Sequence, residues 1–431
     1  MAGSLAPGSS EPLVRVVIAC QGGGSHTAFT AGVLKRLLVA DPDRYRIVGL
    51  SGTSGGAVCA LLAWSALRED DPSEAAELLE RFWADNAATG PVEQWVNAGT
   101  VWAGVLQGLG AMPVVSPYDT PVSVAALEEF RRLLEKQVDF ASFAPDPSAA
   151  FPLLLVGAVD VLSGEFRTFH SRRDRITVDA VLASAAIPNL FRAVRLGGRR
   201  YWDGLFSQNP PVRELIDAEP DELWVIQINP KERETEPQSV LDIADRRNEL
   251  SGNLSLYQEL RFIEKIDQLL ADGQLAAGGK YRQIMVRVVE LSRARLPGHL
   301  GPASKLNRDP RFLRSLIDHG ERQAEEFLTA LAFERAWTAR DGTALLALFA
   351  DDAELIAQPP FAPGVHRGRS QLRRFVDDQL CQVARVDPTH KQVARDRVVW
   401  TVRARDGETI RPGRAEAELR DGLVTRLWVG R

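Results

Sequence analysis

Cysteine is scarce in this chain of 431 residues. Cys20, Cys59 and Cys381 are the only three, and they lie far apart in the sequence. An odd, widely spaced set is neither a disulfide framework nor the paired spacing of a zinc site. The sequence therefore predicts a reducing compartment and no metal centre.

The chain also lacks a long apolar run and a secretory leader. The longest apolar stretch, residues 57–67, is too short to cross a bilayer, which takes about 20 residues. Residues 1–13 are mostly small residues and prolines, without the basic and apolar regions of a signal peptide. We expect a disordered tail there and a cytoplasmic protein, while peripheral contact with a membrane stays open.

An excess of positive charge is missing as well. The formal net charge is −5, which argues against nucleic-acid binding, because that function needs clustered positive charge. Apolar residues make up 45% and charged residues 25% of the chain, the balance of a soluble globular protein. The length predicts two or three domains.

Two strand–turn–helix units open the chain. Residues 14–20 (VRVVIAC) and 45–50 (YRIVGL) read as buried strands, and a glycine-rich turn and a helical pattern follow each of them. Such units in series predict an α/β domain with a parallel sheet. Further strands are expected at 152–161, 164–170, 222–229 and 283–291, and amphipathic helices at 73–86, 124–137 and 239–270.

The segment 90–119 is rich in Trp, Gly and Val but has no clean period. One interpretation is an irregular insertion into the core. The other is an apolar cap beside a substrate cleft. In the second case Trp95 and Trp102 would line a groove for an acyl chain.

A serine stands in the turn after the second strand. Ser54 is the centre of Gly52-Thr53-Ser54-Gly55-Gly56, a G-x-S-x-G pattern between a buried strand and an apolar helix. This is the setting of a nucleophile elbow, and the Ser54 amide would sit at a helix N-terminus that favours negative charge. Glycines also occur in ordinary strand–helix turns, so the pattern alone does not decide.

Three glycines, Gly22, Gly23 and Gly24, end the first strand. They lack the lysine of a phosphate-binding P-loop and the spacing of a dinucleotide-binding motif. Their amides suit an oxyanion hole, because an acyl-transfer intermediate needs fixed N–H donors and no metal. The alternative is a glycine turn that only allows close packing of strand and helix.

A base for Ser54 is needed next. His299 and His319 follow the sheet in the chain order of an α/β-hydrolase, but neither has a strand-end setting, and we expect both at the surface. Asp203, followed by Gly204 in RRYWDGLFSQNPP, is the stronger candidate, provided that it lies within about 3 Å of the hydroxyl. The alternative is a plain Asp-Gly turn.

Taken together, these pieces resemble the patatin-like phospholipase family over about residues 14–330. The segment ASAAIPNLF (183–191) before the aspartate agrees with that family, and VIQINP (225–230) and the helix at 242–263 agree with a bacterial branch of it. The resemblance implies a three-layer α/β fold with a mainly parallel sheet. It also implies a Ser-Asp dyad, with Ser54 as nucleophile, Asp203 as its base and the amides of Gly22–Gly24 as the oxyanion hole.

The sequence departs from the family at two positions. Thr27 stands where the family has glycine, and Leu205 stands where it frequently has a second glycine after the aspartate. A β-branched residue does not readily adopt positive φ. The loop at Thr27 must therefore use an ordinary backbone conformation or be slightly reshaped.

The last part of the chain, residues 331–431, has a different texture. Residues 332–355 read as two helices joined by a turn, and three alternating strand patterns close the chain. This pattern resembles the nuclear transport factor 2-like (SnoaL-like) α+β cone, which often encloses an apolar pocket and often dimerises. The resemblance implies a homodimer through this domain. His366, Asp351 and Asp352 are either pocket residues or, as we prefer, an acidic pair at a helix end (Asp351 and Asp352) and a surface histidine (His366).

These observations predict a serine acyl hydrolase that needs no cofactor. The expected substrate is a carboxylic ester, in a lipid first of all, and a storage polyester or a small ester as the second option. A third option is a lipid- or polyketide-binding scaffold whose hydrolase site is silenced by Thr27. We expect no nucleic-acid partner.

Overall fold

The computed structural model describes residues 13–430 apart from short gaps, so the expected tail lies almost wholly outside the described residues. The positions not described are 1–12, 109–110, 112–114, 189, 234, 277, 279–280, 292–295, 297–299, 302, 360, 381–383, 395–396, 407–408 and 431.

A mainly parallel sheet organises the first part of the chain. The β-branched strand β1 (Val14–Cys20) pairs in parallel with β2 (Tyr45–Gly52) on one side and with β7 (Glu222–Gln227) on the other. The order across this part of the sheet is β8-β7-β1-β2-β3-β6-β5, and β4 also pairs with β3. The other bounds are β3 Leu153–Asp160, β4 Phe166–His170, β5 Val194–Leu196, β6 Arg199–Asp203 and β8 Met285–Glu290.

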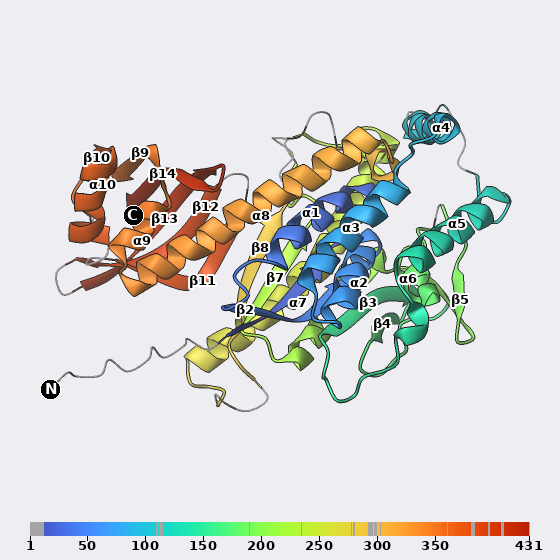
Figure 1. Cartoon of the computed structure of the whole chain (residues 1–431), viewed down its shortest axis with the longest axis horizontal. Helices are drawn as coiled ribbons and strands as arrows, with labels where there is room; N and C mark the ends of the chain where they lie inside the picture. The colour runs from blue at the N-terminus through green and yellow to red at the C-terminus, as the bar shows by residue number, and fades with distance from the viewer. Residues whose placement is uncertain are drawn as a thin grey trace.

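Helices cover both faces of this sheet, which gives the expected three layers (Figure 1). Successive side chains of a strand point to opposite faces: Ile18 packs with the helices of one face and Val17 with Leu256 and Leu260 of the other. The first face is covered by α1 (Ala28–Leu37), α2 (Gly55–Leu67), α3 (Pro72–Asn86), α5 (Val122–Gln137), α6 (Val178–Ser184) and α8 (Pro310–Ala339), and the second by α7 (Val240–Ala271).

The segment without a clean period is largely helical. Residues 91–108 form α4 (Pro91–Gly108), which lies at the end of the molecule away from the C-terminal domain (Figure 1). Short helical turns connect the larger elements. They are η1 (Gly24–Thr27), η2 (Phe140–Ser142), η3 (Gly204–Phe206), η4 (Arg213–Ala218), η5 (Ala303–Leu306) and the π-helical η6 (Val376–Leu380).

The C-terminal domain is an α+β unit around its own apolar cluster. Its strands are ordered β10-β9-β14-β13-β12-β11. The expected second helix forms only over residues 342–347. Its expected continuation to residue 355 is wrong, because residues 349–357 form a strand. The bounds are α9 Gly342–Ala347, β9 Phe349–Ala357, β10 Gly364–Arg367, α10 Arg369–Phe375, β11 Ala384–Ala394, β12 Arg397–Asp406, β13 Thr409–Arg420 and β14 Leu423–Gly430.

One long helix belongs to both domains. The first turns of α8 pack into the core of the parallel sheet, and its last turns, with Phe333 and Trp337, pack into the C-terminal core. The boundary expected after residue 330 therefore falls inside a continuous helix. The two sheets also meet, because Val289 in β8 pairs in parallel with Val393 in β11.

Candidate active site

Ser54 occupies the sharp turn between β2 and α2. Its backbone has φ +58° and ψ −131°, a conformation that costs a residue with a side chain roughly 1–3 kcal/mol. Glycines make the turn sterically feasible. A Cβ on Gly52 would lie 2.4 Å from the Gly56 carbonyl oxygen, and a Cβ on Gly56 would lie 2.3 Å from that of Cys20. The motif thus forms the strained strand-to-helix turn that its pattern predicts.

A second serine supports this turn. The Ser54 amide donates to Ser184 Oγ at 3.0 Å, and the Ser184 hydroxyl donates to the Gly157 carbonyl oxygen at 2.6 Å. Ser184 lies at the end of α6 and is fully buried. No local sequence pattern marks Ser184, because its role depends on α6 meeting β3 beside the elbow.

Asp203 lies at the end of β6, where its backbone pairs with Ala158 of β3. Its side chain is 1% exposed, and the Ser54 hydroxyl lies close enough to lower the pKa of its carboxyl. Asp203 Oδ1 also accepts the Leu205 amide at 2.8 Å. The structure therefore brings the two predicted dyad residues together from positions 149 apart in the sequence.

The surroundings of Asp203 set its proton affinity. Burial raises the pKa of the carboxyl to about 7, while the Leu205 amide and the Ser54 hydroxyl oppose that rise. Burial dominates because it removes water from around the charged form. Near neutral pH, Asp203 can therefore both accept and return a proton.

The glycine run lies directly against the elbow. A Cβ on Gly22 would be 2.6 Å from the Thr53 carbonyl oxygen and 2.9 Å from Ser54 Cβ, so only glycine fits there. The Gly22 amide, however, donates to Asn209 Oδ1 at 2.7 Å. Among the described residues, the amides of Gly23 and Gly24 have no hydrogen-bond partner. These two amides are the available donors, and the Gly22 amide is engaged.

Thr27 follows the glycine run with an ordinary backbone. Its φ of −73° and ψ of −1° are helical, so the residue carries no left-handed strain. Its hydroxyl donates to the Gly24 carbonyl oxygen at 2.6 Å, and Gly55 packs against the same hydroxyl. Thr27 therefore closes the turn in which the glycine amides lie.

A network of buried amides holds the other side of the glycine run. Gln21 Oε1 accepts the amides of Ile228 and Asn229 at 2.9 and 2.7 Å. Gln21 Nε2 donates to Asn253 Oδ1 of α7 at 2.9 Å. Gln21 was not among the predicted site residues, although a polar residue directly after an apolar strand is a signal that the sequence contains.

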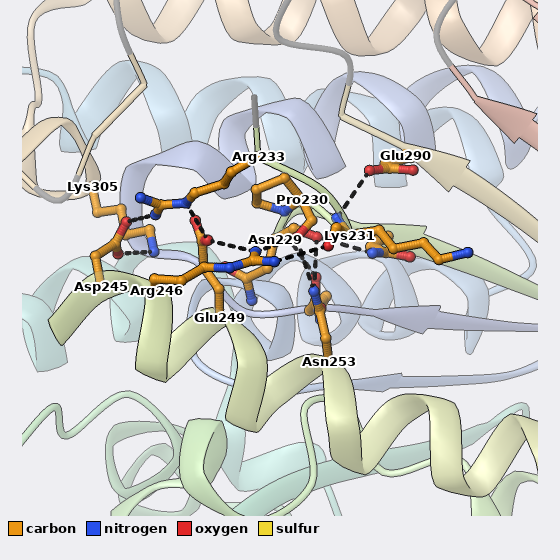
Figure 2. A network of polar contacts seen from close by, with 12 residues as sticks. Asn229, Pro230, Lys231, Arg233, Asp245, Arg246, Glu249, Asn253, Glu290 and Lys305 are labelled. Atoms are coloured by element: carbon orange, nitrogen blue, oxygen red, sulfur yellow. Dashed lines mark hydrogen bonds and ion pairs between the residues drawn. The ribbon is translucent and has the colours of Figure 1, made fainter. Parts of the chain in front are cut away.

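Ion pairs continue this network along α7, as Figure 2 shows. Arg233 binds Asp245 and Glu249 at 2.6 and 2.9 Å, and Lys305 binds the other oxygen of Asp245 at 2.7 Å. Arg246 donates to Glu249 and to backbone carbonyl oxygens after β7. Asp245 and Glu249 are buried, so the pairing avoids the cost of isolated buried charge.

The same network fixes η5 over the glycine run. The backbone of Lys305 lies against Gly24. A Cβ added to Gly24 would be 2.4 Å from the Lys305 carbonyl oxygen. The neighbouring Ser304 hydroxyl is 2.8 Å from His26 Nε2. The loop that contains η5 is therefore part of the wall around the glycine amides.

The alternative bases lie elsewhere. His319 is fully buried in α8, with its ring 5.6 Å from that of Phe29, so the expectation of a surface position is wrong. Its helix packs against α1, which the sequence pattern did not reveal. His299 lies outside the described residues.

The two predicted groove residues are on the outside of α4. Trp95 is 79% exposed and Trp102 is 65% exposed. Their assignment to an acyl groove stays a prediction.

The residues singled out in the C-terminal domain do not gather around a described cavity. Asp351 and Asp352 lie exposed in β9, and Asp351 pairs with Arg369. The ring of His366 is half-buried, 4.6 Å from the ring of Phe375. The acidic pair therefore belongs to a strand and not to a helix end.

Two of the three cysteines are free and buried, Cys20 and Cys59, and Cys381 lies outside the described residues. Burial raises the pKa of the Cys59 thiol to about 12. In the described part of the chain, no cluster of His, Cys, Asp and Glu has the arrangement of a metal site. Nor is any helix there both long and apolar enough to span a membrane.

Comparison with known proteins identifies two domains. Residues 18–216 match the patatin-like phospholipase family, and residues 330–427 match the SnoaL-like domain. The uncharacterized protein YjjU of Escherichia coli strain K12 is 26% identical over 239 residues. That alignment covers 55% of this chain and 58% of YjjU, so the match spans only part of the relative's length.

Solved structures match about a quarter of the chain. The protein RV0760c of Mycobacterium tuberculosis is 18% identical, with a TM-score of 0.22, over 25% of this chain and 90% of that chain. An NTF2-like protein of unknown function from Cytophaga hutchinsonii is 12% identical, with a TM-score of 0.20, over 24% of this chain and 85% of that chain.

Proposed function

Because the chain carries a patatin-like phospholipase domain over residues 18–216 and a C-terminal SnoaL-like domain, we propose that it is a serine acyl hydrolase that cleaves a carboxylic ester with a Ser54–Asp203 dyad. The observation that carries the proposal is the placement of the Ser54 hydroxyl beside the buried carboxyl of Asp203. It joins a nucleophile in a strained turn to a base whose pKa lies near neutrality.

In the first half-reaction, Ser54 Oγ attacks the ester carbonyl carbon while Asp203 takes the hydroxyl proton. The carbonyl oxygen becomes an oxyanion, which accepts hydrogen bonds from the amides of Gly23 and Gly24. The bond to the alcohol then breaks, and Asp203 returns the proton to the leaving oxygen. The products are a free alcohol and an acyl-enzyme on Ser54.

Water completes the cycle. Asp203, ionised again, takes a proton from a water molecule that attacks the acyl carbonyl carbon. The second oxyanion rests on the same glycine amides. When the bond to Ser54 Oγ breaks, the proton passes to the serine and the carboxylic acid leaves.

The lipid nature of the ester rests on the family match. A Ser-Asp dyad fixes the bond that is cleaved and not the alcohol, so a polyester or a small ester remains the second substrate class. The ordinary backbone of Thr27 gives no support to a silenced scaffold.

Covalent labelling with a fluorophosphonate tests the proposal. Wild type should label at Ser54, while Ser54→Ala should not label and Asp203→Asn should label about 100-fold more slowly or worse. Asp160→Asn is the matched control. Asp160 is also buried at a strand end and accepts the amide two residues on, so this variant should label like wild type.

Failure of folded wild type to label would contradict the proposal. If wild type labels, hydrolysis of a series of esters with increasing acyl length separates the substrate classes. A preference for long chains supports a lipid, and a preference for short chains supports the small-ester alternative.

A further inference from the structure

Helix α4 presents an apolar surface to solvent. Val92, Trp95 and Trp102 are 76%, 79% and 65% exposed. Three more apolar side chains of the same helix, Val96, Val105 and Leu106, are also exposed. Their spacing of three, four and seven residues puts most of them along one side of the helix. We call these six residues the α4 apolar face.

A narrow opposite side attaches the helix to the molecule. Asn97 is 7% exposed, and its side chain donates to Asn307 Oδ1 at 3.0 Å and accepts the Arg308 amide at 2.8 Å. Farther along, Gly104 lies against Ala303, where a Cβ would be 3.4 Å from Ala303 Cβ. The helix is therefore fixed to the loop around η5, while the side chains of its apolar face are exposed.

The face offers no charge to a partner. Glu93 is the only charged residue among the 18 of α4. Its carboxylate accepts the amides of Thr89 and Gly90 at 3.0 and 2.9 Å, which keeps it at the start of the helix. An uncharged surface with two tryptophans matches the boundary between the hydrocarbon and the head groups of a neutral lipid layer. A partner protein recognised through charge would find no complement here.

The attachment also places α4 next to the loop that covers the proposed oxyanion donors. The loop that receives Asn97 contains η5, whose Ser304 contacts His26 and whose Lys305 backbone packs on Gly24. A lipid layer held by α4 would thus be separated from the wall of the site by the width of this one helix. Figure 1 shows α4 at the free end of the molecule, remote from the C-terminal domain.

We propose that α4 docks the protein onto the surface of a neutral lipid layer, with Trp95 and Trp102 as its anchors. The choice of a lipid as the occupant rests on the proposed function. The absence of charge, the two tryptophans and the position of α4 beside η5 are observed independently of the proposed function. In this arrangement the tryptophans contact the layer from outside and do not line an acyl groove.

The test is co-flotation of Ser54→Ala protein with phosphatidylcholine vesicles, which needs no catalysis. We expect binding that persists in high salt, because apolar contacts are not screened. Replacing each tryptophan by glutamate should weaken it about tenfold. The matched control is Leu162→Glu at the turn after β3, since Leu162 is 79% exposed but lies outside α4, and it should float like the parent.

Two outcomes would overturn the docking proposal. The first is that the Ser54→Ala protein does not float with vesicles although the wild type hydrolyses soluble esters. This result would leave the proposed function standing. The other is a dimer in lipid-free solution that Trp95→Glu dissociates, because a second copy would then cover the face. Circular dichroism checks the fold of each variant. Should the tryptophan variants misfold, Val92→Glu repeats the test.

Discussion

The carboxyl group of Asp203 should control the pH dependence of the reaction. Burial raises its pKa to about 7, and the proposed base works only when ionised. The rate of fluorophosphonate labelling should therefore rise with pH through about 7 and level off above it. A titration from about pH 5 to about pH 9 measures this rate. A profile that is flat across neutral pH would show that another group, or none, acts as the base.

Asn209 is the residue that holds the Gly22 amide in place. It is fully buried and reaches Gly22 across 187 positions of the sequence. Asn209→Leu keeps a similar volume but removes the acceptor, so the glycine run loses its anchor. We expect labelling of Ser54 to slow by about tenfold to 100-fold, because misplaced oxyanion donors lower the rate of the chemical step. Stopped-flow hydrolysis of a soluble ester should show the loss in kcat more than in KM.

A matched buried amide distinguishes positioning from general stability. Gln323 in α8 is 3% exposed and donates to Glu326. Gln323→Leu should lower the melting temperature to a similar degree and leave kcat unchanged. Equal losses of kcat in Asn209→Leu and Gln323→Leu would show that Asn209 has no specific role in positioning the glycine run.

At the scale of elements, the close approach of α2 to β1 depends on a single glycine. A Cβ on Gly56 would meet the backbone oxygens of Cys20 and Gln21 at 2.3 and 2.7 Å. Gly56→Ala should thus destabilise the protein by about 3 kcal/mol or more, since backbone cannot move away as a side chain can. Urea unfolding measures the difference.

Gly99 provides the comparison within a helix. An added Cβ there meets nothing within 4 Å, and alanine favours a helix over glycine by about 0.8–1 kcal/mol. Gly99→Ala should therefore be neutral or stabilising. A loss of stability in Gly99→Ala equal to that in Gly56→Ala would refute the steric explanation.

At the scale of the whole molecule, an ion-pair cluster joins the parallel sheet to the shared helix. Arg287 of β8 binds both oxygens of Glu222 at 2.7 and 2.9 Å and reaches Glu334 of α8 at 3.1 Å. The cluster lies next to the point where α8 enters the C-terminal core. Arg287→Met leaves the two carboxylates without their guanidinium, which should cost about 3–5 kcal/mol.

Calorimetry measures the effect of Arg287→Met as the number of unfolding transitions. Because α8 and β8 contribute to both units, wild type should unfold in one main transition and Arg287→Met in two. Arg314→Met is the control, since Arg314 forms an exposed pair with Glu80 that is worth about 1 kcal/mol or less. Two separate transitions in wild type would mean that the shared helix does not couple the domains.

The sequence by itself determined the local frame of the candidate site. The tight turns at Ser54 and at the glycine run were predictable, because a strand, a tight turn and a helix each depend on a few consecutive residues. The α/β class followed in the same way from the buried strands at 14–20 and 45–50.

Only the tertiary structure decided how these parts are supported. The bond of Asn209 to Gly22, the bond of Ser184 to Ser54 and the burial of His319 each join distant segments, and no local pattern encodes such a meeting. Likewise, a strand at 349–357 replaced the predicted helix because its alternating side chains complete the C-terminal core. Side-chain periodicity shows that one face of an element is apolar. Contacts between distant segments decide whether that face is buried, as it is on α8, or exposed, as it is on α4.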